Sequence, residues 1–139
     1  MTEIDKQDER IGFIFGGEIP DVTEESLATY LTYLKEHIEL PCELTGIEDF
    51  DWEEYYVIGP GDQKEYEKLK KTKPSYTDKY DMLSLATEVD EWVGILVNLK
   101  RVSDKKKFTL PLAELKATDE KLKNYQLLDD YSVWFVNNR

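Results

Sequence analysis

Alternation of apolar and polar residues in the C-terminal third of the chain is the feature that most constrains its fold. Apolar side chains stand at alternate positions of residues 94–100 and again of residues 108–115. Such alternation predicts strands with one buried and one exposed face. Pro111 has no N–H group to donate to a ladder, so the second strand is expected to end or bend there. The aromatic and β-branched residues of 131–136 predict a third strand.

An amphipathic helix is predicted near the N-terminus, over Thr23–Glu39. Thr23 is a suitable N-cap, and Leu40-Pro41 is expected to end the helix. Its apolar stripe follows the spacing of a single helix face. The stripe consists of Leu27, Tyr30, Leu31, Leu34 and Ile38. We expect this face to lie against the strands.

Shorter elements fill the rest of the chain. Strands are predicted at residues 42–46, 55–58 and 82–89, and a short helix is predicted to begin after Asp62. Residues 11–17 are predicted to form a strand or an apolar strap over the core. The fold class that fits best is α+β, with the N-terminal helix packed on a small antiparallel SH3-like β-barrel.

The length of 139 residues predicts a single domain. We place this domain at residues 11–139 and expect residues 1–10 to form a flexible N-terminus. Cys42 is the only cysteine, so no disulfide can form within the chain, which fits a reducing, cytoplasmic location. No stretch is long and apolar enough to span a membrane, so we expect no membrane partner.

Charge is distributed unevenly along the chain. Residues 11–63 contain thirteen acidic residues and one basic residue, a net charge of −12, which equals the formal charge of the whole chain. The remaining residues are therefore neutral as a group. A surface this acidic lacks the Lys and Arg footprint that nucleic acids require, so nucleic acid is excluded as a partner. A basic protein partner is compatible with it.

His37 and Cys42 are the only residues of their types in the chain. They form no convincing pair of nucleophile and base, and one histidine is too few for a multi-histidine zinc or iron site. We therefore expect that the protein is not an enzyme. A hydrolase that uses two carboxylates as acid and base stays open as a third-ranked hypothesis.

Carboxylates are concentrated between residues 48 and 54. The five acidic residues there are Glu48, Asp49, Asp51, Glu53 and Glu54. If this segment is extended, Asp49, Asp51 and Glu53 point to one side, while Phe50 and Trp52 anchor it to the core. Like charges so close repel one another, and a hard cation such as Ca²⁺ relieves the repulsion with oxygen ligands. The alternative is a solvated acidic edge that prevents aggregation.

The spacing of Asp49, Asp51 and Glu53 matches the first three ligand positions of an EF-hand loop. Position six is Glu54 instead of Gly, and position twelve is Pro60 instead of Glu, so the segment is not an EF-hand. A second acidic pair, Asp129 and Asp130, could complete a site or cap a turn.

Residues 105–115 and 124–137 resemble the C-terminal signature of a bacterial calcium-binding protein family typified by the cyanobacterial protein CcbP. Residues 27–34, followed by Leu40-Pro41-Cys42, resemble the N-terminal half of the same family. The resemblance covers about Ser26 to Asn137. It implies a small, acidic, cytoplasmic calcium-binding domain that buffers or sequesters Ca²⁺ without EF-hands.

Two functional hypotheses follow. The first is a non-EF-hand calcium-binding protein that uses clustered carboxylates. Its main ligands would be Asp49, Asp51, Glu53 and Glu54, with Glu48, Asp129 and Asp130 as secondary ligands. The second is an acidic SH3-like interaction module for a basic protein partner. Its groove would be lined by Tyr55, Tyr56, Trp92 and Trp134.

Overall fold

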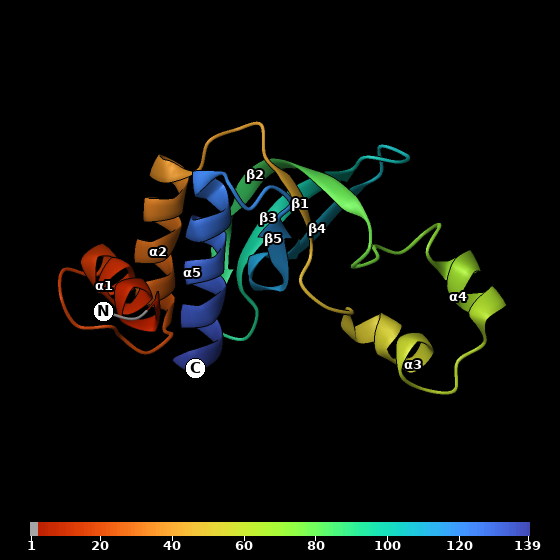
Figure 1. Ribbon diagram of the computed structural model, residues 1–139, viewed down its shortest axis with the longest axis horizontal. Coiled ribbons are helices and arrows are strands. Elements are labelled where there is room, and N and C mark those ends of the chain that lie inside the picture. Colours follow the sequence, from red (N-terminus) through yellow and green to blue (C-terminus); the bar gives the residue numbers. More distant parts are fainter. Residues whose placement is uncertain (1–2) are drawn as a thin grey trace.

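The computed structural model describes residues 3–139 as an α+β fold (Figure 1). Three helices form a layer on one side: α1 (Glu3–Ile14), α2 (Glu24–His37) and α5 (Lys123–Asn137). Two short helices, α3 (Glu54–Val57) and α4 (Gln63–Leu69), project from the opposite end of the molecule. Within residues 3–139, no helix is long and apolar enough to cross a membrane.

A five-stranded antiparallel sheet lies between the helical layer and the projecting helices. Its strands are β1 (Glu43–Gly46), β2 (Lys79–Asp90), β3 (Gly94–Arg101), β4 (Lys107–Pro111) and β5 (Leu115–Ala117). The strand order is β4-β3-β2-β1-β5. Strands β4 and β5 are the two edges and do not pair with one another, so the sheet is not closed and the SH3-like barrel is not confirmed.

Several local predictions are confirmed. Thr23 caps α2: its side chain accepts a hydrogen bond from the Ser26 N–H, and the Ser26 hydroxyl accepts one from the Thr23 N–H. Helix α4 follows Asp62, whose carboxylate accepts from the Lys64 N–H. Strands β1, β2 and β3 lie where strands were predicted, and β4 ends at Pro111.

The predicted strand at 131–136 is wrong, because this segment belongs to helix α5. The buried positions Leu127, Leu128, Tyr131, Trp134 and Phe135 recur at the spacing of one helix face. Aromatic and β-branched residues favour a strand, but this preference mainly reflects packing on a half-buried surface, whereas the helical period of the buried positions specifies the element here. Tyr131 and Trp134 of this face pack in the core against Tyr30 of α2, and Phe135 stacks on Tyr131.

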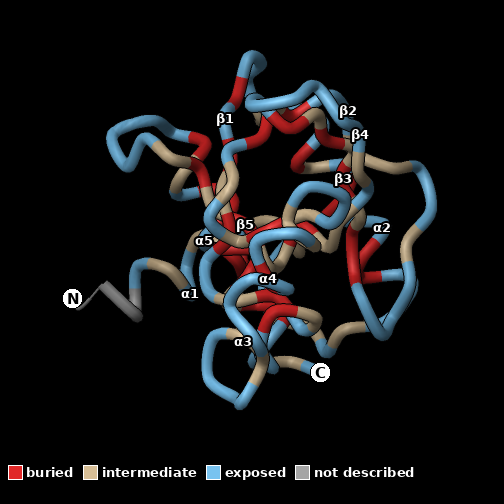
Figure 2. Tube along the Cα trace, turned by 90° about the vertical axis from the view of Figure 1, so that its right-hand side faces the viewer, coloured by how far each residue is buried: buried red, intermediate tan, exposed pale blue. Residues whose placement is uncertain are grey.

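The predicted strand at residues 55–58 is also wrong, because residues 55–57 lie in α3. Residues 11–14, predicted as part of a strand or of an apolar strap over the core, are the last turn of α1. Residues 3–10, which we expected to be flexible, are part of α1, whereas residues 1 and 2 lie outside the described residues. Buried Ile11 attaches α1 to the main core. In Figure 2, buried positions concentrate along the strands and where helices meet them, while the loops that bear α3 and α4 are mostly exposed.

Candidate cation site

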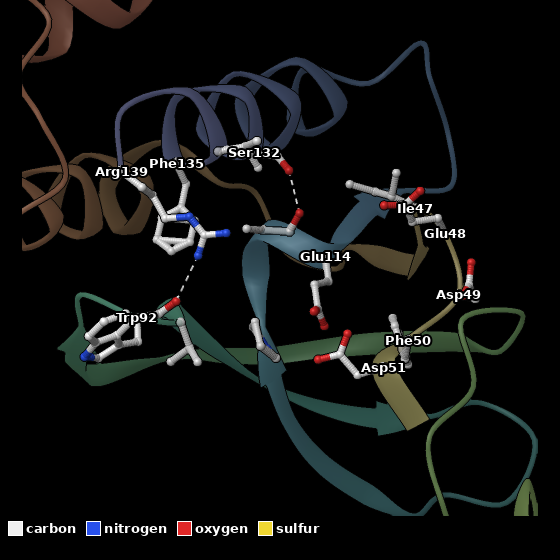
Figure 3. Close-up of a pocket in the computed structure, with 14 residues that line it drawn as sticks. Ile47, Glu48, Asp49, Phe50, Asp51, Trp92, Glu114, Ser132, Phe135 and Arg139 are labelled. Carbon is white, nitrogen blue, oxygen red and sulfur yellow. Dashed lines mark hydrogen bonds between the residues drawn. The ribbon is translucent and has the colours of Figure 1, made fainter. Parts of the chain in front are cut away.

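A cavity of about 490 Å³ lies between the segment 47–51, the 3-10 turn η2 (Leu112–Glu114) and helix α5 (Figure 3). Four carboxylates line it: Glu48, Asp49, Asp51 and Glu114. Apolar residues of the β2–β3 turn and of α5 line the other end, together with Arg139. The cavity therefore has an acidic end and an apolar end.

Backbone hydrogen bonds fix the acidic end. The Gly46 N–H donates to the Tyr76 carbonyl at 3.0 Å, and the Ile47 N–H donates to the Glu114 carbonyl at 2.9 Å. A Cβ atom at residue 46 would lie 2.6 Å from the Tyr76 Cα, so this close approach requires glycine. Buried Phe50 then anchors the chain before the 3-10 turn η1 (Asp51–Glu53). This course brings Asp51 opposite η2.

Asp51 and Glu114 form the centre of the acidic end. Figure 3 shows their carboxylates pointing toward one another across the cavity, whereas Glu48 and Asp49 lie along the loop to one side. Partial burial, and then the negative charge of Asp51, raise the pKa of Glu114. Both effects mean that the ionised form of Glu114 is disfavoured until a positive charge approaches.

Glu53 has a different environment, although it is only two residues from Asp51. Its side chain is fully buried. The Tyr66 and Ser75 hydroxyls donate to its Oε2, each at 2.6 Å, and the Tyr76 and Phe50 N–H groups donate to its Oε1 at 2.8 and 3.3 Å. Four donors satisfy the carboxylate inside the protein, so we remove Glu53 from the candidate ligands.

The condition of an extended backbone, under which Asp49, Asp51 and Glu53 would point to one side, is not met. Asp51 to Glu53 form η1, and the tighter turn places Asp51 in the cavity while Glu53 enters the interior. Burial, and then the hydrogen bond with Glu53, raise the pKa of Tyr66, which keeps the phenol protonated as a donor. Glu53 therefore joins η1 to α4 and to the segment that precedes β2.

The remaining predicted ligands do not meet at the cavity. Glu54 is exposed on α3 and is not among the lining residues. Asp130 accepts hydrogen bonds from Arg10 at 2.8 and 2.9 Å and from Gln7 at 2.9 Å. Asp129 accepts from Gln7 at 3.2 Å. Both aspartates thus connect α5 to α1.

Glu114 is the residue that our sequence reasoning missed. Phe108, Leu110 and Leu112 occupy alternate positions, and Glu114 stands where the next apolar residue is expected. This interruption was an available signal for a polar contact at the end of the alternating run. It could not indicate the contact with Asp51, which is 63 positions earlier in the chain.

The site is sparse in protein ligands. Among residues 6–139, whose side chains the structure describes, no group of three or more His, Cys, Asp or Glu side chains is arranged to hold a metal ion. Any cation at the Asp51–Glu114 pair would therefore need further oxygen ligands from water or from the backbone.

The fold is similar to the crystal structure of Anabaena CcbP, with a TM-score of 0.56 and 14% sequence identity. The alignment covers 99% of this chain and 94% of that chain. No protein-family model matches the sequence, and no curated protein matches it either. At this level of identity the likeness describes the fold alone.

Proposed function

We propose that the protein is a non-enzymatic, non-EF-hand calcium-binding protein, with Asp51 and Glu114 as the two central ligands. Glu48 and Asp49 strengthen the negative potential at the same cavity. The observation that carries the proposal is the pair of facing carboxylates in Figure 3, one on η1 and one on η2. Low-affinity buffering or sequestration of Ca²⁺ is the role that we propose for such a site.

The energetic argument is electrostatic. Burial of Glu114, and then the negative charge of the exposed Asp51 opposite it, disfavour the ionised form of Glu114 and raise its pKa. A divalent cation between them converts this repulsion into attraction. Ca²⁺ suits the arrangement better than Mg²⁺, because Ca²⁺ accepts irregular geometry and mixed oxygen ligands, while Mg²⁺ demands a near-ideal octahedron.

The small number of ligands also sets the expected affinity. A cage that offers two protein carboxylates, with the other coordination positions left to water or carbonyl groups, belongs with weak calcium sites. Such sites have dissociation constants of roughly 10⁻⁴–10⁻³ M. The proposal thus concerns a protein that responds to high Ca²⁺ levels rather than to trace amounts.

The fold likeness to Anabaena CcbP supports the proposal indirectly. CcbP typifies the calcium-binding family that residues 105–115 and 124–137 resemble, and the shared fold extends over almost the whole of both chains. The resemblance in sequence and the likeness in fold therefore point to the same family. Neither identifies ligands, so the ligand proposal depends on the cavity alone.

Isothermal titration calorimetry with Ca²⁺ tests the proposal. We expect binding to the wild-type protein and at least a tenfold loss of affinity in Asp51→Asn and in Glu114→Gln. Glu54→Gln is the matched control, because it removes one negative charge from an exposed position outside the cavity. Equal losses in all three variants would mean that only the general negative field attracts the ion. Absence of heat and of thermal stabilisation at millimolar Ca²⁺ would end the proposal.

A further inference from the structure

The apolar end of the cavity carries unusually exposed side chains. Trp92 is 84% exposed and Val136 is 61% exposed, and both line the same cavity as Asp51 and Glu114. Val93, at 40% exposure, lies beside them. We call these three residues the Trp92 rim. Exposed tryptophan beside a concave surface is typical of sites where one side chain contributes much of the binding energy.

The Trp92 rim stands on a well-fixed turn between β2 and β3. The Asp90 carboxylate accepts hydrogen bonds from the Trp92 N–H at 2.6 Å and from the Val93 N–H at 3.3 Å. The guanidinium of Arg139 donates to the Trp92 carbonyl at 3.1 Å, as Figure 3 shows, and Glu91 accepts from the first N–H of α2 at 3.1 Å. A fixed turn lowers the entropy lost when a partner binds to the indole.

The cavity is larger than a cation requires. One water molecule takes up about 30 Å³ of liquid, so Ca²⁺ with six waters fills roughly 200 Å³. The cavity holds about 490 Å³. Its apolar lining would contribute nothing to a hydrated ion, but it is suited to the aliphatic or aromatic part of a larger ligand.

Charge identifies the kind of ligand. Four carboxylates and one guanidinium line the cavity, and the Arg139 guanidinium already contacts the Trp92 carbonyl and the Phe135 ring. The acidic end is thus complementary to a positive charge, and the Trp92 rim is complementary to an apolar group. Basic residues next to apolar residues in one polypeptide segment provide both.

We propose that the cavity and the Trp92 rim dock a basic, apolar segment of a partner protein. A Lys or Arg side chain of the partner enters between Asp51 and Glu114, and a neighbouring apolar side chain packs on Trp92 and Val136. Because the partner and Ca²⁺ use the same two carboxylates, each excludes the other. This competition rests on the proposed calcium function, whereas the docking itself does not.

The groove predicted from the sequence is only partly retained. Trp134 is buried, and its Nε1 donates to the Pro20 carbonyl. Tyr55 and Tyr56 pack against one another on α3, and Tyr56 stacks on Tyr66. Of the four aromatic residues that we expected, Trp92 alone lines the cavity.

Fluorescence anisotropy with a labelled eight-residue Lys-Leu repeat tests the docking, with Glu-Leu and Lys-Ser repeats as comparison peptides. We expect the Lys-Leu peptide to bind at least tenfold more tightly than either comparison peptide. Trp92→Ala, and separately the double variant Asp51→Asn with Glu114→Gln, should each weaken binding at least tenfold. Phe13→Ala is the matched control for the indole, because Phe13 is 79% exposed but lines a different cavity. Glu54→Gln is the control for charge.

The docking proposal is overturned if the Trp92→Ala variant binds the Lys-Leu peptide as tightly as the wild-type protein does. It is also overturned if the control variants Phe13→Ala and Glu54→Gln lose as much affinity for the peptide as the variants that they match. Addition of Ca²⁺ at constant ionic strength then separates the two proposals. Peptide binding without any calorimetric response to Ca²⁺ supports the docking and refutes the calcium function. Ca²⁺ binding without peptide binding supports the calcium function and refutes the docking. Ca²⁺ binding that leaves the peptide bound would overturn the shared use of Asp51 and Glu114.

Discussion

The sharpest prediction concerns Glu53, because the spacing of acidic residues in the sequence and the structure assign this residue opposite roles. As a cation ligand, it could be replaced by Gln with little loss of stability. As a buried acceptor of four hydrogen bonds, it cannot. The change Glu53→Gln keeps the size of the side chain but replaces one oxygen by an NH₂ group, so two of the four donors lose their acceptor.

The magnitude follows from which oxygen is replaced. The NH₂ group is best tolerated at the position of Oε2, because the Tyr66 and Ser75 hydroxyls can rotate, and the Ser75 Oγ already lies 2.9 Å from the Thr77 Oγ1. At the position of Oε1 it would face two backbone N–H groups. Hydrogen bonds to a charged group contribute about 1.5–3 kcal/mol each, and the hydroxyls recover part of this loss. We therefore expect Glu53→Gln to lower the free energy of unfolding by about 2–4 kcal/mol.

Urea denaturation and thermal melting measure this loss. For a domain of this length, about 3 kcal/mol corresponds to a fall in Tm of roughly 10 °C. Glu54→Gln, at the adjacent exposed position, should change the free energy of unfolding by less than about 0.5 kcal/mol. If Glu53→Gln melts within about 1 °C of the wild-type protein, then the network around Glu53 does not stabilise the fold and the argument is refuted.

Three further predictions concern other charged residues. Arg101 is 2% exposed, and its guanidinium donates to the carbonyls of Lys70, Lys71 and Lys73 and to the carboxylates of Asp78 and Asp104. Because Lys cannot reproduce this fork of donors, Arg101→Lys should lower the free energy of unfolding by about 3 kcal/mol in urea denaturation. A loss below about 1 kcal/mol would contradict this. The hydrogen bonds from Arg101 lower the pKa of Asp104 to about 2. The ionised Asp104 carboxylate therefore stabilises the folded state above pH 4, and this stabilisation disappears as the pH falls toward 2. The unfolding curves of Asp104→Asn and of the wild-type protein should differ at pH 7 and converge near pH 2. Burial, and then the charge of Asp51, instead raise the pKa of Glu114, so ionisation of Glu114 destabilises the folded state as the pH rises above about 4.5. Glu114→Gln should therefore be more stable than the wild-type protein at pH 7 and equally stable at pH 4. A loss of stability of Glu114→Gln at pH 7 without Ca²⁺ would refute this interpretation.

Local sequence patterns determined much of this fold. The alternating residues of 94–100 and the position of Pro111 specify β3 and the end of β4, because a pleated strand presents successive side chains to opposite faces. Thr23 and Asp62 specify where α2 and α4 begin, since an N-cap needs only its own turn. Each of these signals is complete within a few residues of the element that it specifies.

Tertiary contacts decided which acidic residues are available to a ligand. Asp51 and Glu53 have similar chemistry and lie two residues apart, yet η1 turns one into the cavity and the other into a set of four donors. Three of those donors come from Tyr66, Ser75 and Tyr76, which no local pattern connects to Glu53. Glu114 likewise reaches Asp51 only because strands β1 and β5 pair. The sequence by itself determined the local elements that carry their own signal, α2, α4 and β3, and the excess of negative charge. The packing of distant segments decided where that charge is exposed, because burial and hydrogen bonding depend on partners far away in the chain.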